Sequence, residues 1–242
     1  MGRGEAGPDA VARLFEADGG VFATAPAEIA RRLERVRALV FDWDGVFHEG
    51  RKGPGAPSGF AEPDSMGVNL LRFALWRRDG RLPVAAIVTG QADLAAAELA
   101  GRERFHALYV GVLDKAAALK HLREAQSLAP DEVAVVFDDV NDLGMAAESG
   151  VRILVARPGG PLTRRHALER GLADYVTGGD AKRHAVRETA ELLLGLMGAF
   201  EAVARSRVAF DDTYRGYLAE RSAIVTSRFA WRDGRIELAA GP

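Results

Sequence analysis

The stretch from Val36 to Val46 reads VRALVFDWDGV and sets the expected fold. A buried β-strand is predicted over Val36 to Phe41, because short runs of β-branched and aromatic residues favour extended backbone. Two carboxylates, Asp42 and Asp44, follow where the strand runs out, and Gly45 allows the chain to turn. Ligand sites of open α/β sheets lie at the carboxyl ends of strands, so this pair marks a candidate site. Taken alone, the pair is as typical of a solvated turn or a helix cap as it is of a ligand site.

Short apolar runs alternate with longer segments of helical period along the whole chain. This alternation predicts the α/β class, with a doubly wound parallel sheet covered by helices on both faces. Strands are predicted at Val36 to Phe41, Val84 to Val88, Ala107 to Val110, Val133 to Phe137 and Val151 to Val155, with a short sixth at Tyr175 and Val176. Helices are predicted at Met66 to Arg78, Asp93 to Ala100, Lys115 to Ala125, Asp142 to Glu148 and Leu162 to Arg170.

Two further segments complete the expected organisation. Gly50 to Gly59 is dense in Gly and Pro, which predicts a loop or the tip of a hairpin. Ala185 to Ala204 is predicted to be one long helix, apolar on more than one side, that serves the core or also builds a subunit contact. The catalytic domain is expected at 36–204, between extensions at 1–35 and 205–242 that carry no interpretable motif.

Composition restricts the classes of function. The 242 residues are 48% hydrophobic, enough for one α/β domain with a core. Because 32 basic residues balance 34 acidic ones, nucleic-acid and membrane partners have little support. The absence of cysteine excludes disulfides and thiolate chemistry. Without an apolar leader or a stretch of roughly 20 apolar residues, we expect a soluble, cytoplasmic protein.

Polar residues also follow the second predicted strand. Thr89 and Gly90 offer a hydroxyl and backbone N–H groups that can hold phosphate oxygens. Taken singly, this pair is more typical of a helix cap.

Asp138, Asp139 and Asp142 follow the fourth strand. If this strand lies beside the first, the like charges of two acidic clusters disfavour ionisation unless a cation binds. Ligands that are all oxygen select a hard metal, and Mg²⁺ is the usual partner of phosphate. Lys115, at the start of a predicted helix, adds a positive charge if it faces the same crevice, although a single lysine is more often exposed to solvent.

At this point the chain resembles a known family. The ordered motifs Asp-x-Asp-Gly-Val, Thr-Gly, Lys and Asp-Asp-x-x-Asp resemble those of the haloacid dehalogenase superfamily, with too little sequence between them for a large cap domain. From Ala38 to Leu194 the chain is similar to the 3-deoxy-D-manno-octulosonate 8-phosphate phosphatases. The resemblance implies a three-layer, Rossmann-like fold with a minimal cap, and a Mg²⁺-dependent phosphatase.

The resemblance also implies roles for individual residues. Asp42 would be the nucleophile and a metal ligand. Asp44 would be the general acid and base, with its backbone carbonyl on the metal. Lys115 would steady Asp42 and the transferring phosphoryl group. Retention of the second aspartate favours phosphatase over dehalogenase, because dehalogenation has no alkoxide to protonate.

The remaining motif residues would bind phosphate and metal. Thr89, with Gly90, would hold the phosphoryl oxygens. Asp138 would complete the metal site, with Asp139 or Asp142 nearby in an outer shell.

Departures from the family pattern concern specificity more than catalysis. His48-Glu49-Gly50 replaces Thr-Asp-Gly, Phe137 replaces a glycine, and 181–184 replaces Gly-Gly-x-Gly. His48, Arg51, Lys52 and Lys182 are each open to a substrate contact or to a solvated position. The expected substrate is a small phosphorylated metabolite, such as a sugar-acid phosphate, whose identity stays open.

Two rival functions remain at this stage. One is a catalytically silent relative that serves as an oligomerisation module, and the other is a phosphotransferase. The intact acids argue against the first, and the open site disfavours the second, which must exclude water. A homo-oligomer, a tetramer by preference, is expected, in which Gly50 to Gly59 closes the site at a subunit boundary.

Overall fold

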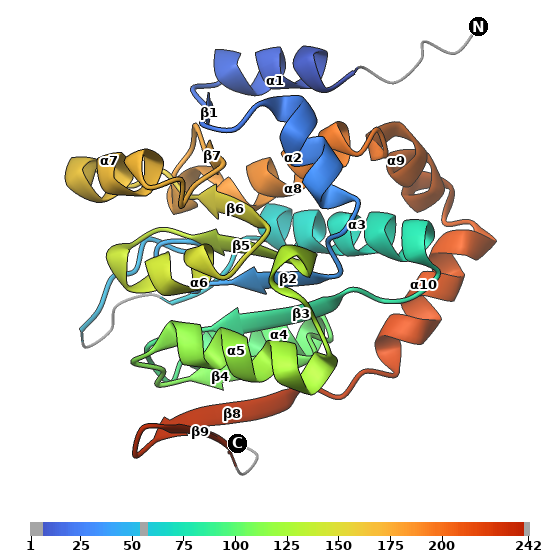
Figure 1. Ribbon diagram of the computed structural model, residues 1–242. Helices are drawn as coiled ribbons and strands as arrows, with labels where there is room; N and C mark the ends of the chain where they lie inside the picture. Colours follow the sequence, from blue (N-terminus) through green and yellow to red (C-terminus); the bar gives the residue numbers. More distant parts are fainter. Residues whose placement is uncertain (1–6, 54–57, 240–242) are drawn as a thin grey trace, which may run out of the picture.

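The computed structural model describes residues 7–53 and 58–239, and within them the strands form one mixed sheet (Figure 1). The strand order is β1-β7-β6-β5-β2-β3-β4-β8-β9, and only β1 and β9, the two edge strands, run antiparallel to their neighbours. The strands are β1 (Val21–Phe22), β2 (Ala38–Phe41), β3 (Val84–Val88), β4 (Ala107–Val110), β5 (Val133–Phe137), β6 (Val151–Leu154), β7 (Tyr175–Val176), β8 (Ser227–Arg232) and β9 (Arg235–Leu238). The predicted parallel α/β sheet is confirmed.

Helices cover both faces of the sheet, and alternate strand residues point to each layer. Leu39 and Phe41 of β2 pack in the first core cluster, whereas Ala38 and Val40 pack in the second. The first layer contains α1 (Pro8–Ala17), α2 (Pro26–Leu33), α3 (Glu62–Asp79), α4 (Leu94–Arg102), α8 (Ala185–Leu196), α9 (Phe200–Ala209) and α10 (Asp212–Ser222). The second layer contains α5 (Lys115–Gln126), α6 (Leu143–Ala147) and α7 (Pro161–Glu169). Short 3₁₀ turns occur at η1 (Pro130–Glu132), η2 (Val140–Asp142) and η3 (Ala181–Arg183). This is the three-layer, doubly wound arrangement expected from the alternating sequence pattern.

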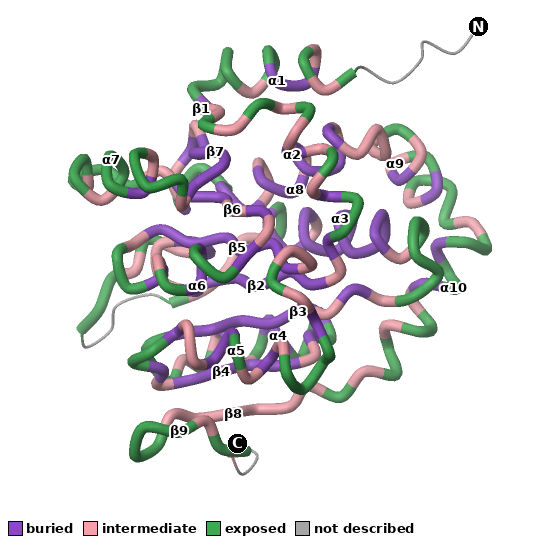
Figure 2. The backbone as a smooth tube through the Cα atoms, viewed as in Figure 1, coloured by how far each residue is buried: buried purple, intermediate pink, exposed green. Residues whose placement is uncertain are grey.

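The central strands are buried on both sides, and exposure increases towards the edges (Figure 2). The segments at the two ends of the chain add these edges: β1 pairs with β7, while β8 runs parallel to β4 and turns back into β9. The end segments therefore extend the same sheet. Among the described residues, no helix combines the length and apolar character needed to cross a membrane.

One predicted helix is wrong in its extent. Ala185 to Ala204 is divided into α8, which ends at Leu196, and α9, which begins at Phe200. Gly198 separates them with a φ of +60°, a left-handed conformation that glycine adopts without strain. The Ala199 N–H donates to the Leu194 carbonyl and the Gly198 N–H to that of Gly195, which closes the end of α8.

The expected helix over Asp142 to Glu148 is shorter than predicted. It begins with the 3₁₀ turn η2 and continues as α6, which ends at Ala147. Between β2 and α3, the described residues of 42–61 contain no helix and only an isolated bridge between Asp44 and His48, so the predicted minimal cap is confirmed. Within Gly50 to Gly59, residues 54–57 lie outside the described residues, and the expected hairpin stays a prediction.

Candidate active site

Three strand ends bring the sequence motifs to one edge of the sheet. β2 lies between β3 and β5, and its last residue, Phe41, is in register with Ile87 and Val136. The motif residues that follow these strands therefore emerge side by side. The arrangement meets the condition stated for a cation site, since the two acidic strand ends are neighbours.

Asp42, Asp138 and Asp142 form a buried acidic triad. One carboxylate oxygen from each lies within 4.8 Å of those of the other two. Lys115 is buried beside them, and its Nζ donates to Asp42 Oδ1 and Asp142 Oδ1, each at 2.5 Å. The solvent-exposed alternative for Lys115 is therefore wrong. Asp142, expected in an outer shell, lies within the triad itself.

Burial makes the charges of the triad costly. It raises the pKa of Asp42 well above its usual range, and the charge of Asp142 adds to the rise while Lys115 opposes it. Burial and Asp142 raise the pKa of Asp138 to about 6, and burial also raises that of Asp142. Burial lowers the pKa of Lys115, but Asp42 and Asp142 outweigh it and the net shift is upward.

The donor chemistry of the triad fits a hard divalent cation. Three ionised carboxylates, with Lys115 and with Arg157 on Asp138, leave one net negative charge at the site. Carboxylate oxygens at this separation are the ligands that Mg²⁺ selects in proteins. The triad therefore forms a divalent-metal site.

Gly45 allows the backbone to pass close to the triad. Its φ is +86°, and a Cβ built there would lie 1.9 Å from Asp138 Oδ2. Both the left-handed conformation and this approach require glycine. The Gly45 N–H donates to the His48 carbonyl at 2.8 Å, which closes the turn after β2.

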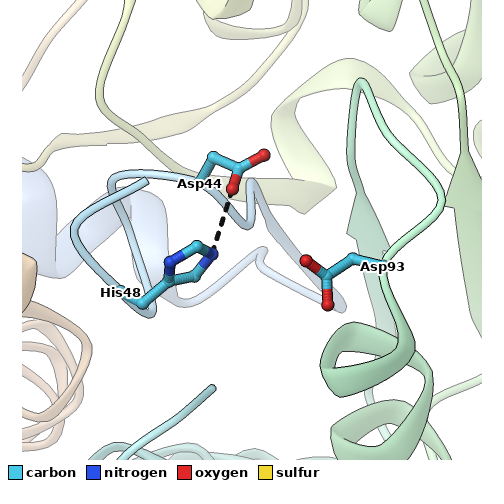
Figure 3. A group of neighbouring side chains, drawn as sticks. All are labelled: Asp44, His48 and Asp93. Carbon is cyan, nitrogen blue, oxygen red and sulfur yellow. Dashed lines mark ion pairs between the residues drawn. The ribbon is translucent and has the colours of Figure 1, made fainter. Parts of the chain in front are cut away.

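The Asp44 carboxylate lies outside the triad, in a second group with His48 and Asp93 (Figure 3). Lys52 Nζ donates to Asp44 Oδ1 at 2.5 Å, and His48 Nε2 lies 3.0 Å from the same oxygen. Partial burial acts to raise the pKa of Asp44, but the contacts with His48 and Lys52 outweigh it and lower the pKa. Asp44 is thus partly accessible and ionised.

Sequence reasoning missed the connection from this group to α4. Trp43 Nε1 donates to Ser58 Oγ at 3.3 Å, and Ser58 Oγ donates to Asp93 Oδ2 at 2.6 Å. Asp93 Oδ1 also accepts the N–H groups of Ala95 and Ala96, which caps α4. Asp93 was predicted only as the first residue of a helix, because nothing in the local sequence links it to Ser58.

Thr89 and Gly90 lie at the end of β3. Thr89 is fully buried, and its hydroxyl accepts the Gln91 N–H at 3.3 Å. Gly90 is exposed, and a Cβ built there would lie 3.7 Å from the Val112 carbonyl oxygen, an ordinary contact. The helix-cap alternative for this pair is wrong, because Asp93 caps α4 four residues after Thr89.

Arg157, after β6, was also missed. Its Nη1 donates to Asp138 Oδ2 at 2.6 Å and to Asp139 Oδ2 at 2.8 Å. Asp139 is partly exposed and caps the turn η2 by accepting the Val140 N–H. An Arg-Pro-Gly-Gly sequence after a strand is ordinary loop composition, so only the position of β6 beside β5 reveals the contact.

The other residues whose role the sequence left undecided lie around the loop after β2. Lys52 binds Asp44, as described above. Arg51 Nη2 is 3.5 Å from Glu49, and Lys182 Nζ is 3.9 Å from the same carboxylate. These two long contacts are exposed and contribute little stability.

Comparison with known proteins agrees with this fold and site, although no protein-family model matches the chain. The 3-deoxy-D-manno-octulosonate 8-phosphate phosphatase of Escherichia coli is 32% identical over 179 residues, which cover 72% of this chain and 88% of that protein. The crystal structure of the Yersinia pestis phosphatase of the same name has a TM-score of 0.60 at 28% identity, covering 72% and 89% of the two chains.

A third relative has ligands in its structure. The 3-deoxy-D-manno-octulosonate 8-phosphate phosphatase of Moraxella catarrhalis was solved with a magnesium ion, a phosphate ion and a KDO molecule. It aligns with a TM-score of 0.62 at 25% identity, covering 76% of this chain and 98% of its own.

Fold and site together define a phosphatase of the haloacid dehalogenase superfamily, with a minimal cap and a divalent-metal site. The sequence similarity also identifies one family within this superfamily. The chain belongs to the 3-deoxy-D-manno-octulosonate 8-phosphate phosphatase family.

Proposed function

We propose that this phosphatase is Mg²⁺-dependent and hydrolyses a sugar-acid phosphate through an aspartyl phosphate on Asp42. One observation carries the proposal: a buried Asp42 shares its lysine partner with Asp142 and lies beside Asp138. In this arrangement a carboxylate that is normally a weak nucleophile is oriented at the end of β2 and kept from water.

The reaction proceeds in two displacements. A carboxylate oxygen of Asp42 attacks phosphorus, the ester P–O bond breaks, and the phosphoryl group passes to Asp42. Lys115 offsets charge on the phosphoryl oxygens, which Thr89 and Gly90 hold at the end of β3. Asp42, Asp138 and the Asp44 carbonyl would hold Mg²⁺, which would supply further positive charge beside the phosphoryl oxygens.

Asp44 handles the protons in both displacements. Asp44, ionised in the free enzyme, first takes up a proton from solvent and gives it to the leaving alkoxide; it then takes one from the water that hydrolyses the aspartyl phosphate. Its position outside the triad suits this task, because the side chain is reachable by both the leaving group and water. Asp139 is partly exposed and lies outside the triad, so we place it in an outer shell that holds Arg157.

The substrate class rests on the named relatives. The Escherichia coli and Yersinia pestis proteins are 3-deoxy-D-manno-octulosonate 8-phosphate phosphatases, and the Moraxella catarrhalis structure holds KDO and phosphate. We therefore place KDO 8-phosphate, or a related sugar-acid phosphate, first. Because such anions do not cross hydrocarbon, the proposal includes a cytoplasmic location.

Phosphate release from a panel of phosphorylated metabolites tests this function. KDO 8-phosphate and other sugar-acid phosphates should give the highest kcat/KM, with Mg²⁺ required and chelator inhibitory. The panel should include acceptor sugars, since phosphate that appears on a sugar instead of in solution would indicate a phosphotransferase. Full turnover by enzyme that contains no metal would contradict the proposal.

We also propose a homotetramer that covers the site. Three large apolar side chains, Leu94, Leu113 and Val140, are exposed in the segments that follow β3, β4 and β5 at the catalytic edge. A neighbouring copy is the natural cover for these side chains. Sedimentation velocity tests the assembly, and a strictly monomeric protein would contradict it.

A further inference from the structure

Asp44, His48 and Asp93 come together from the loop after β2 and the start of α4 (Figure 3). One possible ligand atom from each residue lies within 4.8 Å of those of the other two, and all three residues are half-buried. His48 Nε2 and Asp44 Oδ1 are 3.0 Å apart. Because the ligands of one tetrahedral Zn²⁺ lie roughly 3.3 Å from each other, this separation suits neighbouring ligands of a single ion.

His48 Nε2 is the unusual atom of this group. It is buried, and within residues 7–53 and 58–239 it has no hydrogen-bond partner. The short separation from Asp44 Oδ1 is therefore not a hydrogen bond. A buried nitrogen without a partner is costly, and a bound ion is one way in which a protein recovers that cost. A neutral imidazole can offer the lone pair of this nitrogen to a metal.

Hydrogen bonds hold the Asp93 carboxylate in place. Ser58 Oγ donates to Oδ2 at 2.6 Å, and the N–H groups of Ala95 and Ala96 donate to Oδ1. Partial burial acts to raise the pKa of Asp93, but these donors outweigh it and lower the pKa, so the carboxylate is ionised. Outer hydrogen bonds of this kind orient the ligands of metal sites.

Two contacts must open when a cation enters the group. Lys52 Nζ donates to Asp44 Oδ1 at 2.5 Å, and its side chain is 38% exposed, so the ammonium can withdraw into solvent. The Gly50 N–H donates to His48 Nδ1 at 3.2 Å, and it must turn away because a metal on Nε2 moves the ring proton to Nδ1. A cation and the Lys52 ammonium therefore compete for the same carboxylate.

We propose that Asp44, His48 and Asp93 form a second cation site, which takes Zn²⁺ in preference to Mg²⁺ and inhibits the phosphatase when it is filled. The selectivity comes from the ligand set, because imidazole nitrogen suits Zn²⁺ whereas Mg²⁺ selects oxygen ligands. Binding of Zn²⁺ is independent of the proposed function, and the inhibition rests on it. A carboxylate bound to Zn²⁺ stays deprotonated, so Asp44 no longer exchanges protons with the leaving group or with water.

Calorimetry with Zn²⁺ titrated into the protein in excess Mg²⁺ tests the site. His48→Asn keeps an acceptor near the position of Nδ1 for the Gly50 N–H but removes Nε2, and Asp93→Asn keeps a helix-capping oxygen but removes the charge. Each change should weaken Zn²⁺ binding at least about tenfold. Lys52→Met should strengthen it about twofold to fivefold, because the competing ammonium is gone.

Two controls locate the ion. Asp138→Asn removes an oxygen of the triad and should leave this Zn²⁺ binding in place. His166→Asn, an exposed histidine-to-amide change on α7, should also leave it unchanged. Circular dichroism verifies the fold of each variant, and the opposite sign expected for Lys52→Met separates competition from any loss of stability.

Inhibition is measured on an aryl phosphate at saturating Mg²⁺. Zn²⁺ should stop turnover of the parent, and further Mg²⁺ should not relieve the inhibition, because the two ions bind different groups. The Zn²⁺ concentration that halves the rate should rise at least about tenfold in Asp93→Asn, measured against the rate of that variant without Zn²⁺.

Three results would overturn the inference. Parent Zn²⁺ affinity in both His48→Asn and Asp93→Asn would show that neither residue is a ligand. Loss of Zn²⁺ binding in Asp138→Asn alone would place the ion in the triad. Zn²⁺ binding without inhibition, or inhibition that excess Mg²⁺ relieves in full, would exclude control through Asp44. The proposed function fails separately, if the parent releases no phosphate in Mg²⁺ without Zn²⁺, whatever its affinity for Zn²⁺.

Discussion

Asp42 and Asp44 are the same residue type two positions apart, yet the fold gives them opposite surroundings. The Asp42 side chain is 4% exposed, between Lys115 and two other acids, whereas that of Asp44 is 26% exposed and held by the loop after β2. The difference begins in the backbone. The Asp42 N–H still donates to the Val136 carbonyl of β5, whereas Asp44 lies in the turn that Gly45 closes.

This comparison separates two chemical tasks. Buried charges interact strongly, so the triad suits the binding of a cation and the holding of a nucleophile. A partly exposed carboxylate can exchange protons with the leaving group and with water, which a sealed one cannot. The sequence places both acids after one strand, and the turn assigns them to different groups. Five predictions test this separation, from the largest expected effect to the smallest.

Asp42→Asn should abolish turnover, because it removes the nucleophile with almost no change in volume. We expect a loss of roughly 10⁴-fold or more in kcat on an aryl phosphate. Circular dichroism should show an unchanged fold. Parent activity in the purified variant would show that Asp42 is not the nucleophile.

Asp138→Asn and Asp44→Asn should fail in different ways. Asp138→Asn removes a triad oxygen, so Mg²⁺ binding by calorimetry should weaken at least tenfold. Asp44→Asn keeps the triad and its own carbonyl, so Mg²⁺ affinity should change little while kcat falls about 10²- to 10⁴-fold. If the two variants lost Mg²⁺ affinity equally, the separation of the two groups would not hold.

Magnesium should also raise the thermal stability of the parent and of Asp44→Asn, but much less that of Asp138→Asn. At a Mg²⁺ concentration of about 100 times its Kd, the gain for the parent is about 2.7 kcal/mol. Differential scanning calorimetry with and without chelator measures it. A Mg²⁺-dependent shift of the same size in Asp138→Asn would place the ion elsewhere.

Gly45→Ala should disturb the turn that separates the triad from the group of Asp44. The new Cβ would meet Asp138 Oδ2 in a left-handed backbone, and we expect a loss of about 1–3 kcal/mol in stability together with weaker Mg²⁺ binding. Gly101→Ala is the matched control, since its Cβ would meet nothing within 4 Å in α4. That change should raise stability by about 0.5–1 kcal/mol.

Lys52→Met should have the smallest effect. The lysine contacts Asp44 Oδ1 from an exposed position, and we expect a change in kcat of about tenfold or less because solvent screens exposed ion pairs. Steady-state kinetics on an aryl phosphate measures it. A loss as large as that of Asp44→Asn would show that the function of Asp44 depends on Lys52.

The central sheet and the acids at its edge were predictable from the sequence. Each motif residue directly follows an apolar run, and parallel strands carry such residues to a common edge, as the pairing of β2 with β3 and β5 confirms. The break at Gly198 had a visible signal, because a glycine after a helical stretch is typical of a helix end. The apolar run on both sides of it concealed that signal.

Local sequence by itself determined which residues carry the chemistry: a strand ending in Asp42 and Asp44, a lysine that opens a helix, and a second run of acids after β5. Only the tertiary structure decided how they are grouped. Asp142 joins the triad, Arg157 reaches Asp138 from β6, and Ser58 links the loop to Asp93. Burial and contact across different strands depend on the packing of distant segments, and a spacing pattern along the chain does not encode either one.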